Sequence, residues 1–182
     1  KISYFLSLFL ALTGTMTAAA QEAVISVTEV TEAPADGFYV IHSACSSGNG
    51  YLYTEANLAD RPFRANGSVD LSSQVTANDA KYIWQLTNNP EDGTFTLTHY
   101  QTKKAVPADA ERNKNMSGTE AANLKLETAE DATDGNWFVY QTNYTNGENK
   151  MYIHANKASG IDANWSYWDN ASATGTSVRL KL

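Results

Sequence analysis

The sequence predicts an all-β domain made of three uneven copies of a four-strand unit. No window of 11 or more residues has a clear 3.6-residue apolar period, whereas short runs rich in Tyr, Trp, Phe and Thr alternate with turn clusters such as SSGNG and NNPEDG. The same order of runs also occurs three times along the chain. A β-sandwich, which likewise uses many short strands, is the alternative architecture.

Composition limits the class of protein. The chain has 182 residues, of which 42% are hydrophobic and 18% charged, as expected for one globular domain. A single cysteine excludes an intrachain disulfide framework and a cysteine-based zinc cage, and three well-separated histidines argue against a metal site. The net charge of −7 argues against nucleic acid or an anionic membrane as partner. No cofactor or metal is therefore expected.

The first twenty residues have the pattern of a secretory signal peptide. Lys1 precedes an apolar run from Ile2 to Leu12, and small residues at Ala18–Ala20 then precede Gln21. The apolar run is shorter than the roughly 20 residues that a membrane-spanning helix needs. We therefore expect an exported chain that does not span a membrane and lies in the periplasm, on the cell surface or in the medium. Residues 21–36 form a lead-in, in which Ala23–Val30 could add a strand.

The three units share an order of runs. Each opens with an aromatic run, continues with a second short run and ends in a compact apolar strand. The opening runs are FYVIHSA, TFTLTHY and NWFVYQT; the second runs are GYLYTEA, KKAVPAD and KMYIHAN; the closing runs are YIWQL, NLKLE and SVRLKL. These runs place the domain at 37–182 and the units at about 37–92, 93–134 and 135–182. The stretch Glu120–Ala132 could add one or two helical turns.

Aligning the units predicts equivalent positions. The first set is Tyr39, Phe95 and Phe138, the second is Tyr53, Val106 and Ile153, and the third is Trp84, Leu124 and Val178. Their spacing along the chain is unequal, which rules out a solenoid of stacked units. One unit of short strands cannot bury its own apolar face, whereas three units can close a barrel without exposed edges. The sequence therefore predicts closed threefold packing.

This pattern resembles the ricin-B-type β-trefoil, a carbohydrate-binding fold of three subdomains. That family usually ends each unit with Gln-x-Trp. Here Trp84 stands in the Trp place of the first unit without the Gln, and Leu124 and Val178 stand in the other two. The chain is most similar to divergent trefoil modules in secreted proteins of gut-type Bacteroidetes, which often accompany glycan-degrading enzymes. The resemblance implies a non-catalytic, lectin-like module with a glycan or polysaccharide as partner, and a glycan-degrading enzyme as a second partner.

The best candidate sugar site lies in the third unit, in the stretch GIDANWSYWDN. Sugar binding needs an aromatic ring that stacks on the apolar face of a pyranose and polar groups for its hydroxyls. The stretch supplies Trp165, Tyr167, Trp168 and Asn164, and by the resemblance Asp162 or Asn156 supplies the acidic or amide contact. Strand alternation puts Trp165 and Tyr167 on one face and Trp168 on the other, so at least one ring is expected to point outward. The alternative is that the rings pack within the hairpin.

The other units are weaker candidates. In the first unit Tyr51 and Tyr53 are expected to fill the core, with Glu55 a weak match to the family's pocket acid, and the second unit is expected to be the poorest binder. Motifs of hydrolases, phosphate-binding loops and zinc proteases are absent from the sequence, so no catalysis is expected. Two alternatives stay open. One is a trefoil-type protease inhibitor acting through the Glu55–Asn78 loop with Arg61 and Arg64, and the other is a protein-interaction module without a small ligand.

Overall fold

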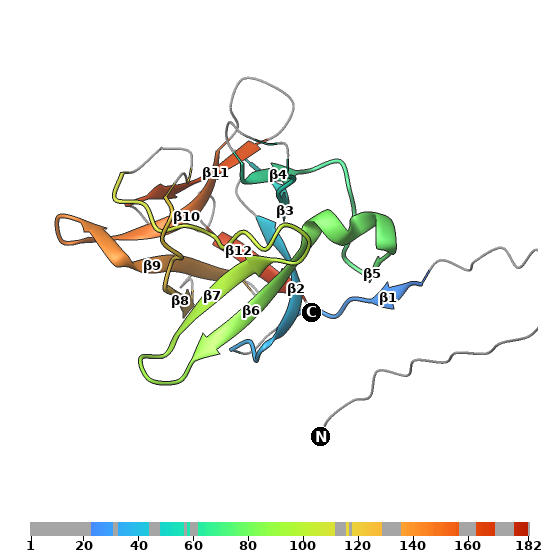
Figure 1. Ribbon diagram of the computed structural model, residues 1–182, viewed down its shortest axis with the longest axis horizontal. Coiled ribbons are helices and arrows are strands. Elements are labelled where there is room, and N and C mark those ends of the chain that lie inside the picture. The colour runs from blue at the N-terminus through green and yellow to red at the C-terminus, as the bar shows by residue number, and fades with distance from the viewer. Residues whose placement is uncertain are drawn as a thin grey trace, which may run out of the picture.

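The structure is a computed structural model (Figure 1). It describes residues 23–30, 33–43, 48–56, 58, 62–111, 116, 118–128, 136–156, 163–169 and 177–181. Nearly all the described elements are strands, which confirms the all-β class. The predicted signal peptide and Asp162 lie outside the described residues.

Six antiparallel strands close a barrel. The strands are β2 (Gly37–Ser43), β6 (Ile83–Asn89), β7 (Thr94–His99), β8 (Leu124–Thr128), β9 (Asn136–Asn146) and β12 (Ser177–Lys181). Pairing runs β2–β6–β7–β8–β9–β12 and returns from β12 to β2, so every strand has two neighbours. A closed ring of this kind has no free edge, and it excludes the β-sandwich.

Three hairpins extend from the barrel. The first joins β3 (Gly50–Tyr53) to β4 (Arg64–Asn66), and the third joins β10 (Asn149–Asn156) to β11 (Ala163–Trp168). In the second unit the pairing shrinks to two isolated bridges, Thr98 with Ala105 and Pro107 with Ala121. A six-stranded barrel with three hairpins is the β-trefoil arrangement.

The register corrects two aligned positions by one residue. The closing strands pair with the opening strands at Tyr39–Trp84, Phe95–Leu124 and Trp137–Val178. Trp137, and not the predicted Phe138, therefore occupies the third place. A shift of one residue turns a side chain to the opposite face of a strand, and Phe138 packs outside the barrel against Tyr152.

The same error affects the first unit. Leu52 lies in the main core with Val106 and Ile153, whereas the predicted Tyr53 belongs to a second cluster on the other side of the strand. The main core fills the barrel and the inner faces of the hairpins, with Trp84 fully buried at its centre. Trp84 Nε1 donates a hydrogen bond of 3.1 Å to the Leu52 carbonyl, so its polar edge is satisfied.

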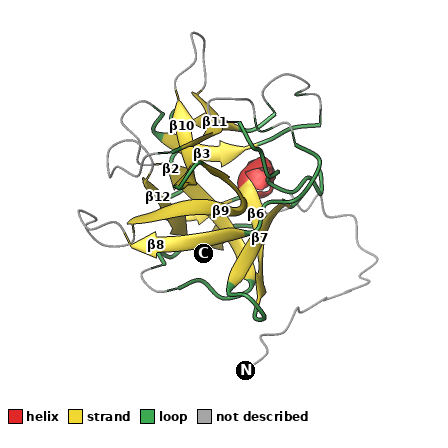
Figure 2. Cartoon of the chain, turned by 90° about the vertical axis from the view of Figure 1, so that its left-hand side faces the viewer, coloured by secondary structure: helices red, strands yellow, loops and turns green. Residues whose placement is uncertain are grey.

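A long insertion covers the outer face of the first hairpin. Residues 67–82 contain β5 (Gln74–Val75), which pairs with β1 (Ile25–Ser26), and η1 (Ala77–Tyr82), a 3-10 helix seen end-on in red in Figure 2. Thr76 and Asp79 form a capping box that begins η1. The helical turns expected in Glu120–Ala132 are wrong for Leu124–Thr128, which is strand β8 because Leu124 and Leu126 alternate towards the core.

Candidate functional site

The candidate site is the outer face of the sheet formed by β9, β10 and β11. Tyr152 on β10 lies directly opposite Tyr140 on β9 and Trp168 on β11. Residues that pair directly across strands project to the same face of the sheet. The three rings therefore form a cross-strand row, which is called the aromatic row below.

Ring contacts hold the aromatic row in place. The ring centroids of Tyr140 and Tyr152 are 5.7 Å apart, and those of Phe138 and Tyr152 are 5.9 Å apart in an edge-to-face arrangement. The His154 imidazole stacks on the Trp168 indole at 5.6 Å with an interplanar angle of 30°. Phe138 and Tyr152 are buried, while Tyr140, His154 and Trp168 are half-buried. The row thus has a fixed base and partly accessible ends.

Charged groups border the aromatic row. Lys150 forms an ion pair with Glu127, and its Nζ lies 4.5 Å from the centroid of the Tyr140 ring. The hydrogen bond with Glu127 raises the pKa of Lys150, and burial followed by the charge of Glu127 raises the pKa of Tyr152. At neutral pH the face therefore presents a lysine cation beside a neutral Tyr152.

Polar groups lie at the β11 end of the face. Asn146 Nδ2 donates a 2.6 Å hydrogen bond to Asp169 Oδ2, and Asn164 is half-buried on the same side of β11 as Trp168. Burial lowers the pKa of His154, and its Nδ1 has no hydrogen-bond partner among the described residues. Amide and carboxylate groups of this kind can hydrogen-bond ligand hydroxyls.

The prediction that Trp165 and Tyr167 bind sugar is wrong, because both side chains are buried. Trp165 is 2% exposed and Tyr167 is 0% exposed, and both belong to the main core. Tyr167 Oη donates a 2.8 Å hydrogen bond to the Pro107 carbonyl in the second hairpin. These rings face inward because the inner side of β11 closes the core, so neither can stack on a sugar.

The remaining predicted site residues divide into two groups. Trp168 and Asn164 lie on the outer face, as strand alternation predicts. The backbone of Asn156 pairs with Asn164 across β10 and β11, while its side chain, like the whole of Asp162, is outside the described residues. Tyr140, Tyr152 and His154 were not predicted as site residues, although the alternation in NWFVYQTNY and KMYIHAN places those side chains on one face.

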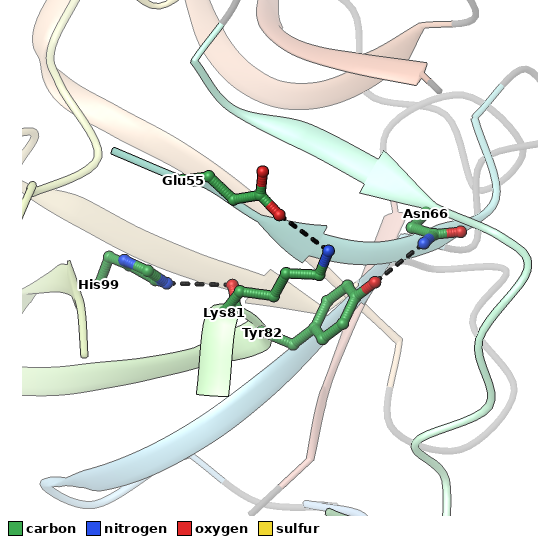
Figure 3. Close-up of polar contacts among 5 residues, drawn as sticks. All are labelled: Glu55, Asn66, Lys81, Tyr82 and His99. Atoms are coloured by element: carbon green, nitrogen blue, oxygen red, sulfur yellow. Dashed lines mark hydrogen bonds and ion pairs between the residues drawn. The ribbon is translucent and has the colours of Figure 1, made fainter. Parts of the chain in front are cut away.

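The first hairpin carries a comparable cluster that is covered. Lys81 of η1 forms a 2.8 Å ion pair with Glu55 (Figure 3). Its Nζ lies 5.1 Å from the centroid of the Tyr53 ring and 5.5 Å from that of the Tyr82 ring. Asn66 Nδ2 donates a 2.8 Å hydrogen bond to Tyr82 Oη. These contacts fasten η1 over the hairpin, and both tyrosine rings are buried, as expected for Tyr53.

His99 contacts the C-terminal end of η1 from the barrel side. Its Nε2 donates a 3.0 Å hydrogen bond to the Lys81 carbonyl (Figure 3). Its Nδ1 accepts a hydrogen bond from the Thr102 amide. Burial lowers the pKa of this histidine. Both ring nitrogens are thus occupied, and the side chain has a structural role.

Two features of the described residues bear on other classes of function. Within that part of the chain, no three His, Cys, Asp or Glu side chains lie together in a way that could hold a metal ion. No described helix has the length and apolar character needed to cross a membrane.

The fold defines the chain as a β-trefoil. No model of a known protein family matches it, and no curated protein matches its sequence. Among solved structures it is similar to a lectin of Polyporus squamosus, with a TM-score of 0.54 and 12% sequence identity over 82% of this chain and 50% of the lectin chain. That lectin was crystallised with the human-type influenza-binding epitope Neu5Aca2-6Galb1-4GlcNAc. This chain thus matches half of the lectin, and the similarity shows a shared fold.

Proposed function

We propose that this protein is an exported, non-catalytic carbohydrate-binding module that binds glycans on the aromatic row. The observation that carries the proposal is the direct pairing of Tyr140, Tyr152 and Trp168 across three strands. The fold shared with a lectin supports it. The apolar faces of sugar rings would stack on Tyr140 and Trp168, while Asn164, Asp169 and Lys150 would contact hydroxyls.

No described segment covers this face, which favours ligand binding over packing. The apolar cluster beneath the row draws its described members from β9 and β10 alone. The cluster on the first hairpin also includes Leu71, Val75 and Tyr82 from the covering segment 67–82. The third hairpin therefore presents rings that, in the first hairpin, are shielded by protein.

The geometry of the row favours an extended polysaccharide over a single sugar. Neighbouring strands lie about 4.8 Å apart, so a row across three strands repeats at a spacing close to the length of one pyranose ring. Because Tyr152 in the middle is 7% exposed, a linear chain would stack on Tyr140 and Trp168 at the two ends of the row, which are two strand spacings apart. Each contact mostly replaces a contact with water, and we expect a Kd of roughly 0.1–10 mM for one site, or about 3–5 kcal/mol.

Export and partnership extend this proposal. The pattern of residues 1–20 supports a cleaved signal peptide, and mass spectrometry of the exported protein should give an N-terminus near Gln21. An exported form that retains Lys1 would contradict it. A weak module gains useful avidity when it is tethered to a catalytic partner, which supports a glycan-degrading enzyme as the second partner.

The described residues argue against the alternative that the protein is a protease inhibitor. The segment Glu55–Asn78 is not one open loop, because it contains β4, β5 and the beginning of η1. Arg64 lies in β4, paired on one side with β3 and on the other with β11. Arg61 is outside the described residues. A reactive loop must project freely into a protease, and the described part of this segment does not.

A glycan and polysaccharide array tests the proposed function. Binding by the parent should fall at least about tenfold in Trp168→Ala, a loss of about 1.4 kcal/mol. Tyr100→Ala is the matched control, since Tyr100 is an exposed ring on the barrel away from the row, and it should bind like the parent. Circular dichroism would establish that both variants fold. A blank array, or equal binding by Trp168→Ala and the parent, would contradict the proposal.

A further inference from the structure

A pocket separate from the aromatic row lies between the first and second units. Its volume is about 310 Å³, at the lower end of the range found for small-molecule sites. One wall is formed by Pro62 and Phe63, which lead into β4. The other walls come from two segments of the second hairpin, and their lining residues are Lys104, Ala105, Pro107, Met116, Gly118, Thr119, Glu120 and Ala121.

The walls of the pocket are fixed by backbone contacts. Ala108 N donates to the Glu120 carbonyl at 2.8 Å, and Ala122 N donates to the Val106 carbonyl at 2.9 Å. A Cβ on Gly118 would lie 2.0 Å from the Ala108 carbonyl oxygen, so the two segments approach as closely as glycine permits. A bound ligand would therefore meet a preformed site, which lowers the entropic cost of binding.

The floor of the pocket is apolar. Phe63 is 4% exposed and Met116 is 1% exposed, and both belong to the main core. The Phe63 ring lies 5.9 Å from the Trp84 indole, which makes Trp84 a fluorescent neighbour of the site. The apolar body of a ligand would fit this floor.

The rim carries opposite charges that do not neutralise each other. Lys104 and Glu120 line the pocket from the two opposing segments, and both are exposed. Among the described residues Lys104 has no ion-pair partner, and Glu120 Oε1 accepts a hydrogen bond from Asn143 Nδ2 at 3.1 Å. A cation and an anion thus border the apolar floor from two opposing segments.

We propose that this pocket binds a small zwitterion with an apolar body, of the kind represented by a free apolar α-amino acid. Lys104 receives the carboxylate, Glu120 receives the ammonium group, and Phe63 with Met116 receives the side chain. Each charge of the ligand meets the opposite charge, which favours a zwitterion over a simple anion or cation. The proposal is independent of glycan binding on the aromatic row.

Amide NMR titration of the full mature chain tests the pocket, with three probes of matched size. Phenylalanine carries both charges, phenylacetate lacks the ammonium group, and phenethylamine lacks the carboxylate. Phenylalanine should shift the amides of Ala105, Thr119 and Ala121 and quench Trp84 fluorescence. Each exposed charge contact should be worth about a two- to fivefold change in Kd, so both truncated probes should bind more weakly by that factor.

Charge variants complete the experiment. In Lys104→Gln, phenylalanine should no longer bind more tightly than phenethylamine. In Glu120→Gln, phenylalanine should no longer bind more tightly than phenylacetate. Lys103→Gln is the matched control, because Lys103 Nζ lies 4.9 Å from the Tyr100 ring and outside the pocket, and it should leave all three affinities unchanged. The proposal is overturned if phenylalanine leaves the pocket amides unmoved, if the three probes bind alike, or if Lys104→Gln and Glu120→Gln bind like the parent.

Discussion

The first and third hairpins contain the same chemical cluster in two different environments. In the first, Lys81 pairs with Glu55 and lies over the Tyr53 and Tyr82 rings. In the third, Lys150 pairs with Glu127 and lies over the Tyr140 ring. Both sets combine a lysine, a glutamate and tyrosines on the outer side of a hairpin.

The difference between them is the covering segment. Residues 67–82 fold back over the first hairpin and contribute Tyr82 and Lys81 to its cluster, whereas every described member of the third cluster comes from β8, β9 or β10. Tyr53 is 6% exposed and Tyr82 is 2% exposed, while Tyr140 is half-buried. Similar residues thus stabilise the fold where a segment covers them, and form the proposed binding surface where no described segment covers them.

The largest expected effect is on stability at the covered cluster. Tyr82→Ala removes a buried ring and the acceptor for Asn66, and the free energy of unfolding should fall by about 3–5 kcal/mol. Tyr140→Ala removes a half-buried ring and should cost about 1 kcal/mol. Urea unfolding of both variants measures the difference. Equal losses would show that the two clusters do not differ as described.

Part of this contrast could be predicted from the sequence. The alternation of aromatic and polar residues indicates strands, and the threefold order of runs indicates a barrel. In WFVY and YLY every residue is apolar, so the pattern does not mark which side chains face inward, and Phe138 and Tyr53 were assigned one residue out of place. Trp165 and Tyr167 lie among polar neighbours although they fill the core.

The covering segment could not be predicted from local patterns. Residues 67–82 are polar and rich in turn-forming residues, which is typical of an open loop. Their contacts with β3 depend on long-range packing of Leu71, Val75 and Tyr82. The third hairpin's open face follows from the lack of such an insertion in its described part, which only the assembled structure reveals.

Protonation of His99 and His154 at low pH should lower the free energy of unfolding by a moderate amount. Burial lowers the pKa of His99 beside the covered cluster and of His154 beside the aromatic row. An unfolded histidine binds its proton more readily, with a pKa near 6.5, so the stabilisation is fully present above pH ~6.5 and is lost as the pH falls through the folded pKa values.

Unfolding free energies measured from pH ~7.5 to ~4.5 should decline across this window. The decline should shrink in His154→Gln, and His42→Gln serves as a control at the remaining histidine. NMR titration gives the pKa of each imidazole. Values for His99 and His154 above the ordinary histidine pKa of about 6.5 would contradict the burial described here.

The two ion pairs should make the smallest contribution to the free energy of unfolding. The Lys150 and Glu127 side chains are 46% and 38% exposed, so solvent screens their attraction and the pair should contribute about 0–1 kcal/mol. The similarly exposed pair of Lys81 with Glu55 should give a comparable value. Double-mutant cycles with Lys→Gln and Glu→Gln substitutions measure both coupling energies. A coupling above about 2 kcal/mol at either pair would show a contribution beyond surface pairing.

The most direct test of the central claim is an aromatic NMR titration of the mature chain with the strongest glycan from the array. The ring resonances of Tyr140 and Trp168 should shift along saturating curves, while those of Tyr53 and Tyr82 stay in place. The glycan should shift none of these rings in Trp168→Ala. Shifts at Tyr53 and Tyr82 with none at Tyr140 and Trp168 would contradict the claim that the open third hairpin, and not the covered first one, binds the glycan.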